Sequence, residues 1–221
     1  MLDAFIANFS GLLLRGTTDT LVMVFVSTAL AYVIGTFLGV VLHLTAPGGL
    51  RPVPVLNTVL GWIVNVGRSL PFIILLIALI PMTMALVRTV TGVWGVIPPL
   101  VVATAPFVAR MIEQSLAEVP RDSVEAAEAC GASVPRIVVS ALLPEALPSI
   151  VRGVAVTLIA VLGYTAIAGA FGAGGLGDIA VRYGYYRYEN EVMIVTVVLL
   201  IVIVQLIQSV CNLVARKVDH R

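Results

Sequence analysis

Long stretches without a single charged residue dominate this chain of 221 residues. They cover residues 21–42, 70–87, 90–109, 153–177 and 192–215. A helix needs about 20 consecutive apolar residues to cross the hydrocarbon core of a membrane. Only 11% of the residues are charged, whereas a soluble domain carries about 25%. The sequence therefore predicts a chain that folds in lipid.

We expect an all-α, polytopic membrane protein that forms one domain over residues 1–221. About five transmembrane helices are predicted, at residues 18–43, 56–87, 91–114, 147–171 and 190–215. Five prolines in or beside the second and third helices predict kinks there, because neighbouring groups can satisfy the carbonyls that a proline leaves free. They are Pro71, Pro81, Pro98, Pro99 and Pro106. Gly35 and Gly39 share one face of the first helix, as either a packing notch within the chain or a seam between two copies.

The basic residues indicate how the chain lies across the membrane. With five spans, one side receives Arg15, Arg88, Arg182 and Arg187. The other side receives nine basic residues: Arg51, Arg68, Arg110, Arg121, Arg136, Arg152, Arg216, Lys217 and Arg221. Because cytoplasmic loops carry an excess of Lys and Arg, the second side is predicted to be cytoplasmic. The N-terminus is then outside the cell membrane and the C-terminus is inside.

Four tyrosines fall in the outer segment between the last two spans: Tyr183, Tyr185, Tyr186 and Tyr188. Tyrosines gather at membrane–water interfaces, where the ring meets acyl chains and the hydroxyl meets water. The segment is therefore either an interfacial aromatic belt or a docking surface for an external partner.

One segment is too polar for a membrane. Residues 110–152 hold ten of the 25 charged residues and form a connection far longer than the two to eight residues that join most helices. Pro120 and Asp122 favour a helix start, and Gly131 can adopt the left-handed conformation that ends one. Ser133 and Pro135 then predict a second short helix that stops before residues 143–144. The sequence predicts a helical hairpin at about 119–143, lying on the cytoplasmic face as an amphipathic interfacial hairpin or projecting as a knob for a partner.

No catalytic, cofactor or metal site is expected. Residues 172–177 spell G-x-G-x-x-G, but a dinucleotide-binding turn follows a strand, and a predicted membrane helix precedes this one. No G-x-x-x-x-G-K-[ST] sequence occurs, so another chain must handle ATP. Neither His43 nor His220 has a carboxylate cluster nearby in the sequence. A net charge of +1 argues against a nucleic-acid partner.

The hairpin resembles the EAA motif of ABC-importer permeases. The matching residues are Glu125, Ala126, Ala127, Gly131, Leu143 and Pro144, while Ala141 stands where the motif usually has isoleucine. The resemblance implies a type I permease fold and a coupling helix that docks into a groove of an ATPase subunit. Further stretches are similar to the methionine-importer branch of that family, at residues 67–76, 105–110, 143–148 and 163–185.

By this resemblance the chain is a permease subunit in a bacterial inner membrane, without enzymatic activity of its own. Its expected partners are a second permease copy, two cytoplasmic ATPase subunits, an extracytoplasmic substrate-binding protein and membrane lipid. Spans without charges fit a small zwitterionic or apolar substrate such as methionine. Tyr164, Thr165, Gly163 and Gly169 are candidates for the pathway or gate, or else make ordinary contacts between helices.

Two alternatives stay open from the sequence. The chain could serve an importer for another small solute. It could also be a stand-alone channel or ion-coupled secondary transporter, although such proteins usually place Asp, Glu or His within the membrane, and the five charge-free stretches contain no Asp or Glu.

Overall fold

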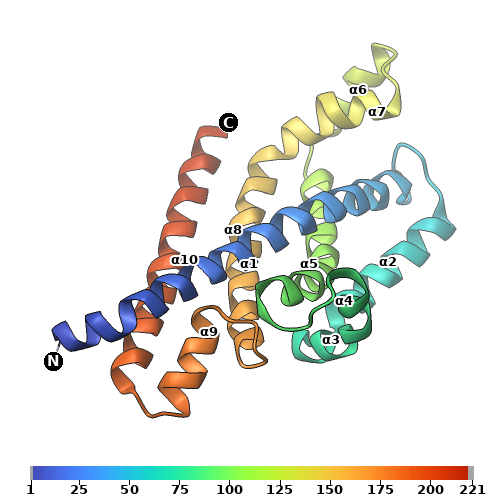
Figure 1. Ribbon diagram of the computed structural model, residues 1–221. Coiled ribbons are helices and arrows are strands. Elements are labelled where there is room, and N and C mark those ends of the chain that lie inside the picture. Colours follow the sequence, from blue (N-terminus) through green and yellow to red (C-terminus); the bar gives the residue numbers. More distant parts are fainter. Residues whose placement is uncertain (1, 219–221) are drawn as a thin grey trace.

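The computed structural model describes residues 2–218, which form helices joined by short connections. His220 and Arg221 lie outside the described residues. Within this described part, ten α-helices and two π-helical segments, η1 and η2, follow one another (Figure 1). Their bounds are α1 Leu2–Thr45, α2 Pro54–Ser69, α3 Phe72–Ala78, α4 Ile80–Val87, α5 Gly92–Ala117, α6 Arg121–Ala129, α7 Val134–Ile137, η1 Val138–Leu142, α8 Leu143–Gly169, α9 Gly175–Ile179, η2 Ala180–Tyr185 and α10 Asn190–Val218.

Four helices of the described chain are long and apolar enough to cross a membrane, or five if a bent pair counts as one span. Three of them cover the predicted first, third and fifth spans: Phe9–Thr45, Gly92–Ala117 and Asn190–Val218. The fourth runs over Val134–Gly169 and includes all but the last two residues of the predicted span at 147–171. The prediction of about five spans therefore agrees with the structure once the bent pair is included.

The second predicted span, 56–87, is broken rather than kinked. The axes of α2 and α3 differ by 103° across Leu70 and Pro71. Leu70 is extended, with φ −81° and ψ 125°, because the ring of a following proline disfavours the helical conformation. In contrast, α5 continues as a helix through Pro98, Pro99 and Pro106. The positions of the prolines in the sequence therefore did not show which of them would break a helix and which would lie within a continuous one.

The glycine face of α1 packs within the chain. A Cβ atom on Gly35 would lie 2.6 Å from the Val108 side chain, and one on Gly39 would lie 2.5 Å from the Ala109 carbonyl oxygen. Only glycine allows α1 to approach α5 this closely. The contact notch within the chain is therefore confirmed for these two glycines.

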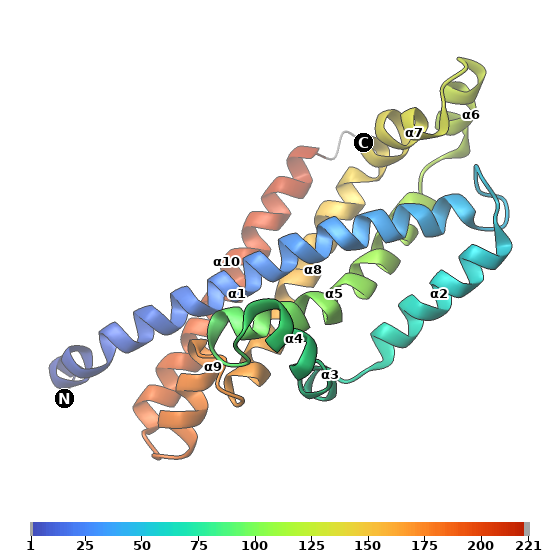
Figure 2. The same cartoon turned by 45° about the vertical axis from the view of Figure 1, so that its right-hand side comes forward.

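Several connections and short helices lie at the two ends of the bundle of long helices (Figures 1 and 2). The α1–α2 connection, α6, α7 and the end of α10 lie at one end, and the N-terminus and α9 lie at the other. The α6–α7 hairpin projects beyond the long helices. The hairpin predicted within the polar segment 110–152 therefore lies outside the bundle of long helices.

The second helix of the hairpin does not stop before Leu143, contrary to the prediction. Helix α7 continues through η1 directly into α8. At this junction the Leu143 N–H donates to the Val138 carbonyl, five residues back. The wider π turn accommodates Pro144, whose ring lacks an N–H and would clash with a carbonyl in a regular α turn. The hairpin is therefore joined to a membrane-spanning helix without a break.

Candidate functional site

Helix α6 is a short, well-terminated helix. Pro120 precedes its first residue, and Asp122 places a carboxylate in the first turn, where the helix dipole favours negative charge. At its other end Gly131 adopts φ +73°. The Gly131 N–H donates to the Glu128 carbonyl at 2.8 Å, and the Ala132 N–H donates to the Ala127 carbonyl at 3.1 Å. This pair of bonds is the Schellman arrangement, so the predicted left-handed end at Gly131 is confirmed.

The residues that resemble the EAA motif lie on both sides of α6. Glu125, Ala126 and Gly131 are exposed, and a Cβ atom on Gly131 would meet no atom within 4 Å. Ala127 is half-buried and packs against the apolar cluster that includes Ile137. Helix α6 thus leans on the rest of the protein with one side and leaves the other side free for a partner.

The Leu-Pro pair of the motif lies outside the hairpin, in the first turn of α8. Leu143 is half-buried against the same cluster as Ala127, and Pro144 is exposed. The two parts of the motif are connected through η1, because α6 contacts η1 and η1 leads into α8. The motif therefore includes residues of α6, which has an exposed side for a partner, and the first residues of α8. A displacement of α6 can be transmitted to α8 through η1.

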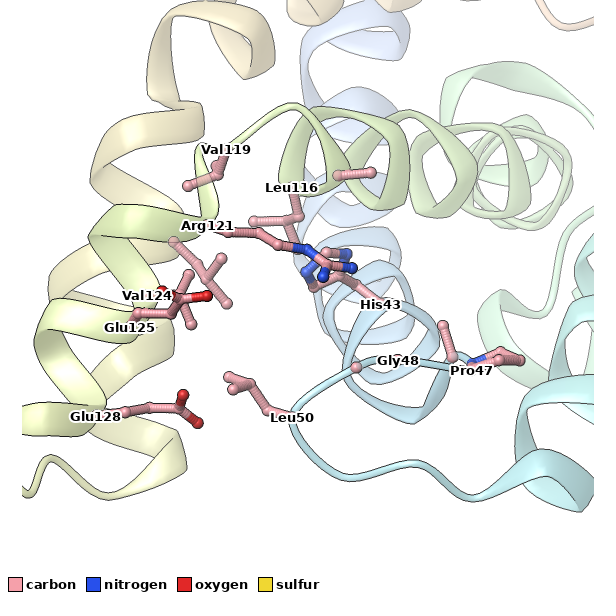
Figure 3. Close-up of a pocket in the computed structure, with 14 residues that line it drawn as sticks. His43, Pro47, Gly48, Leu50, Leu116, Val119, Arg121, Val124, Glu125 and Glu128 are labelled. Atoms are coloured by element: carbon pink, nitrogen blue, oxygen red, sulfur yellow. The ribbon is translucent and has the colours of Figure 1, made fainter.

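A polar cavity of about 490 Å³ separates α6 from the end of α1 and the α1–α2 connection. Figure 3 shows Arg121 extending from α6 towards His43, whereas Glu125 and Glu128 line the cavity further along the helix. The turn around Gly48 forms the facing wall. The cavity therefore has the positive charge of Arg121 at one end and the negative charges of Glu125 and Glu128 along one side.

These charged groups are available to a partner. Within residues 2–218, the side chains of Arg121, Glu125 and Glu128 take part in no hydrogen bond or ion pair. Partners at an interface commonly provide the complementary charges. The described residues also contain no group of three His, Cys, Asp or Glu side chains that could hold a metal ion. The geometry therefore suits the docking of another protein.

Of the four pathway candidates, Tyr164 makes a specific contact. Its ring stacks on Phe72 of α3, with centroids 4.8 Å apart and planes at 17°. Thr165, its neighbour, is 2% exposed, and its hydroxyl donates to the Leu162 carbonyl at 2.7 Å. The two side chains therefore have different surroundings, although they are adjacent in sequence.

The two glycine candidates also differ. A Cβ atom on Gly163 would meet nothing within 4 Å, whereas one on Gly169 would lie 2.5 Å from the carbonyl carbon of Gly177 in α9. Gly169 is thus a packing position between α8 and α9, and Gly163 faces open space. The structure does not bring Tyr164, Thr165, Gly163 and Gly169 into one site, and their role in a pathway stays a prediction.

Sequence reasoning missed the wall of the cavity that faces α6. His43 was considered for a metal site, and no sequence signal marked Gly48. Both lie more than 70 residues before α6 in the sequence, and no periodic pattern links them to it. They lie beside α6 because α1 and α5 run parallel and in contact, so that the end of α1 lies beside the end of α5 that leads into α6.

Comparison with known proteins places the chain in a family. Residues 31–220 match the family model of the binding-protein-dependent transport system inner membrane component. The chain is 49% identical to the probable D-methionine transport system permease protein MetI of Vibrio cholerae, over 96% of this chain and 94% of that one. It is 41% identical to the methionine import system permease protein MetP of Bacillus subtilis, over 81% of each chain.

Solved structures agree with this assignment. A chain of the MetNI methionine ABC transporter, in an inward-facing conformation, superposes with a TM-score of 0.94 at 45% identity, over 96% of this chain and 98% of that one. The predicted fold class is therefore confirmed. The chain belongs to the family of multi-pass inner-membrane permease components of binding-protein-dependent ABC transporters.

Proposed function

We propose that this chain forms the translocation pathway of a methionine importer and is driven by ATPase subunits on separate chains. The similarity to MetI of Vibrio cholerae over almost the whole of both chains carries this proposal. Methionine is zwitterionic, with an apolar side chain, and suits spans that are largely free of charge.

The ATPase partner is expected at the α6–α7 hairpin. Its exposed residues Glu125, Ala126 and Gly131, together with the cavity beside them, offer a projecting surface with unpaired charges. Two ATPase subunits would each hold one hairpin, one from each of two permease copies. A lipid-facing role suits this surface less well, because α6 presents Asp122, Glu125 and Glu128 and contains no buried residue.

Movement of the hairpin would reach the membrane through one continuous helical path. Residues Val134–Gly169 form a single helical stretch of 36 residues, about 54 Å long at 1.5 Å per residue. Its far end packs on α9 through Gly169. A displacement at the ATPase would therefore reach the opposite end of the bundle, as alternating access requires.

A second copy of the chain would complete the pathway. Only 17% of the most apolar part of α10 is buried against the rest of the chain, compared with 33% in α1, 39% in Val134–Gly169 and 56% in α5. One chain therefore leaves this span largely uncovered. A pair of chains around a two-fold axis would enclose a central space between them.

The hairpin end is proposed to be cytoplasmic. The α1–α2 connection, α6, α7 and the end of α10 lie at this end (Figure 1), and they contain Arg51, Arg121, Arg136, Arg216 and Lys217. Arg68, which the sequence grouped with Arg51, lies in the last turn of α2, about 21 Å along the helix from Pro54 at that end. Moving Arg68 to the other side still leaves eight basic residues against five, so the positive-inside rule keeps the same orientation.

The outer end would receive the substrate-binding protein. Tyr185, Tyr186 and Tyr188 are 65%, 70% and 82% exposed there. Tyr188 is held at φ +56°, and the Glu189 N–H donates to the Tyr183 carbonyl at 3.1 Å. An ordered turn that exposes aromatic rings fits a docking surface, because tyrosine is enriched at protein interfaces.

Uptake of labelled methionine tests the proposal. In a strain that lacks this chain but keeps its ATPase and binding protein, expression of the chain should restore uptake. An ATPase partner that binds but does not hydrolyse ATP should abolish it. Restored uptake of another solute alone would change the substrate, and uptake that persists with the inactive ATPase and follows an ion gradient would indicate a secondary transporter.

A further inference from the structure

Four polar side chains form a stripe along the second half of α10. They are Gln205, Gln208, Ser209 and Asn212. Successive residues of a helix lie about 100° apart, so all four fall within an arc of about 100°. All four are exposed, and none forms a side-chain hydrogen bond within residues 2–218. We call this set the α10 polar stripe.

The α10 polar stripe points away from the core of its own chain. Ala215 near the end of the helix is buried at 9% exposure, and beside Gln205 and Gln208 the buried residues are Ile203 and Ile207, at 7% and 8% exposure. Around the helix these two isoleucines lie about 160° and 200° from Gln205. Leu206 and Leu213, 60% and 61% exposed, lie beside the stripe on an apolar flank. The helix therefore has three distinct faces. The first packs on the core, the second is apolar and suits lipid, and the third carries amides and a hydroxyl.

Lipid is an unsuitable environment for the third face. Gln205 lies about 22 Å along a helix of about 43 Å, close to its middle, and Asn212 lies about 10 Å further on. A side-chain amide in hydrocarbon has no hydrogen-bond partner, which makes such a position costly. The stripe must therefore meet water or polar groups of another molecule.

We propose that the α10 polar stripe lines the water-filled inner half of the translocation pathway. This proposal rests on the permease function and on the second copy proposed above. The same face continues to exposed Arg216 at the end of the helix, so polar groups run without interruption from the middle of the span to the cytoplasmic water.

The opposite continuation of this face is apolar. Val198 and Ile201, 51% and 54% exposed, precede Gln205 on it and would close the outer half to water. A pathway open only at the hairpin end is inward-facing, which is also the conformation of the MetNI structure that this chain matches.

The chemistry of the stripe suits passage of a zwitterionic amino acid. Amides and hydroxyls can both donate and accept hydrogen bonds, so they can replace part of the hydration of an ammonium and a carboxylate group. Because the stripe residues are uncharged, they would hold neither group tightly, and the substrate could leave. A dry interface between two helices instead favours small residues, which makes two glutamines a poor choice for one.

Thiol labelling tests this assignment. Cys130 and Cys211 are first replaced by serine, and single cysteines are introduced as Gln208→Cys and Asn212→Cys, with Leu206→Cys and Leu213→Cys as matched controls. The assembled transporter, in inside-out vesicles, is treated with a charged, membrane-impermeant methanethiosulfonate. Thiols react as thiolates, which form in water and not in hydrocarbon, so the two stripe positions should react on the order of tenfold or more faster than the two controls.

Two outcomes would overturn the proposal. Equal, slow labelling at all four positions would place the stripe in lipid. Slow labelling at the stripe together with rapid disulfide formation between two copies would make it a dry interface. The labelling does not depend on substrate identity, so fast labelling in a protein that fails to import methionine would reject the proposed function and retain the stripe as pathway lining.

Discussion

The hydroxyl oxygen of Thr20 on α1 accepts a hydrogen bond of 2.9 Å from the backbone N–H of Leu176 at the start of α9. The same hydroxyl donates to the Gly16 carbonyl at 2.9 Å. A Cβ atom on Gly175 would lie 2.7 Å from this oxygen, so glycine is required there. Both Thr20 and Leu176 are buried. One side chain therefore fixes the glycine-rich turn after α8 to the first span.

Replacing Thr20 with valine should destabilise this end of the bundle. The substitution keeps the shape of the side chain but leaves the buried Leu176 N–H without an acceptor, which costs about 1–3 kcal/mol. Thermal unfolding of the purified protein in detergent should show a Tm lower by several degrees. Thr17→Val is the control, because the Thr17 hydroxyl bonds only to Leu13 within its own helix. An equal fall in Tm for both variants would contradict the tie between α1 and α9.

The two glycines of α8 should respond oppositely to alanine. Gly169→Ala brings a Cβ atom against the Gly177 backbone and should cost about 1–3 kcal/mol through overpacking. Gly163→Ala meets open space and should stabilise α8 by up to about 1 kcal/mol, since alanine favours a helix over glycine. The Tm of each variant measures this difference.

Methionine uptake by the Gly163→Ala variant adds a second result. If Gly163 lines the pathway, uptake falls although the Tm is unchanged or higher. Normal uptake with a normal Tm would remove Gly163 from the pathway candidates. The Gly169→Ala variant cannot serve this purpose, because its packing defect affects both measurements.

The stacked pair Tyr164–Phe72 allows the ring and the hydroxyl to be separated. Tyr164→Phe keeps the stack on α3 and should keep uptake within about twofold of the original, because an aromatic pair contributes through ring contact, about 0.5–1.5 kcal/mol beyond the area it buries. Tyr164→Ala removes that contact between α8 and α3 and should reduce uptake several-fold. Measurement of uptake rates at equal amounts of protein in the membrane checks both. Unchanged uptake in Tyr164→Ala would exclude a role for this residue in the pathway or gate.

The spans were predictable because hydropathy acts locally. Each charge-free stretch must be helical in lipid to satisfy its backbone groups, and the ends of α5 and α10 lie within about three residues of the prediction. The break at Leu70 and Pro71 was harder to foresee. Pro71 interrupts the span, whereas Pro98 and Pro106 lie inside a continuous helix, because the surrounding packing of each proline decides the outcome.

The hairpin was predictable in part. Gly131 acted as expected because a left-handed helix end is determined by a few neighbouring residues. The continuation from α7 into α8 was not foreseen, since Leu143–Pro144 is a stop signal in a regular α-helix and η1 removes the clash. The cavity beside α6 depends on contacts between distant segments, such as Arg121 near Gly48, and a single sequence contains no signal for them.

The bend at Gly131 offers the sharpest test of docking. Its φ of +73° is tolerated by asparagine and aspartate better than by other residues, and both have space there because nothing lies within 4 Å of a Cβ atom. Gly131→Asn and Gly131→Asp therefore introduce side chains of almost the same shape and differ in charge. In the free permease the two variants should have Tm values within about 2 °C of each other, because an exposed substitution changes stability by at most about 0.5 kcal/mol.

In the assembled transporter the two variants should differ. An aspartate at the bend would place a further carboxylate near Glu125 and Glu128, inside the contact with the ATPase, where an unpaired charge loses its water. Gly131→Asp should therefore lose most methionine uptake and recover less ATPase on purification, whereas Gly131→Asn should retain more of both. Equal ATPase recovery and equal uptake for the two variants would show that the hairpin does not enter the ATPase at this bend, and the coupling surface would then have to lie elsewhere on the cytoplasmic end.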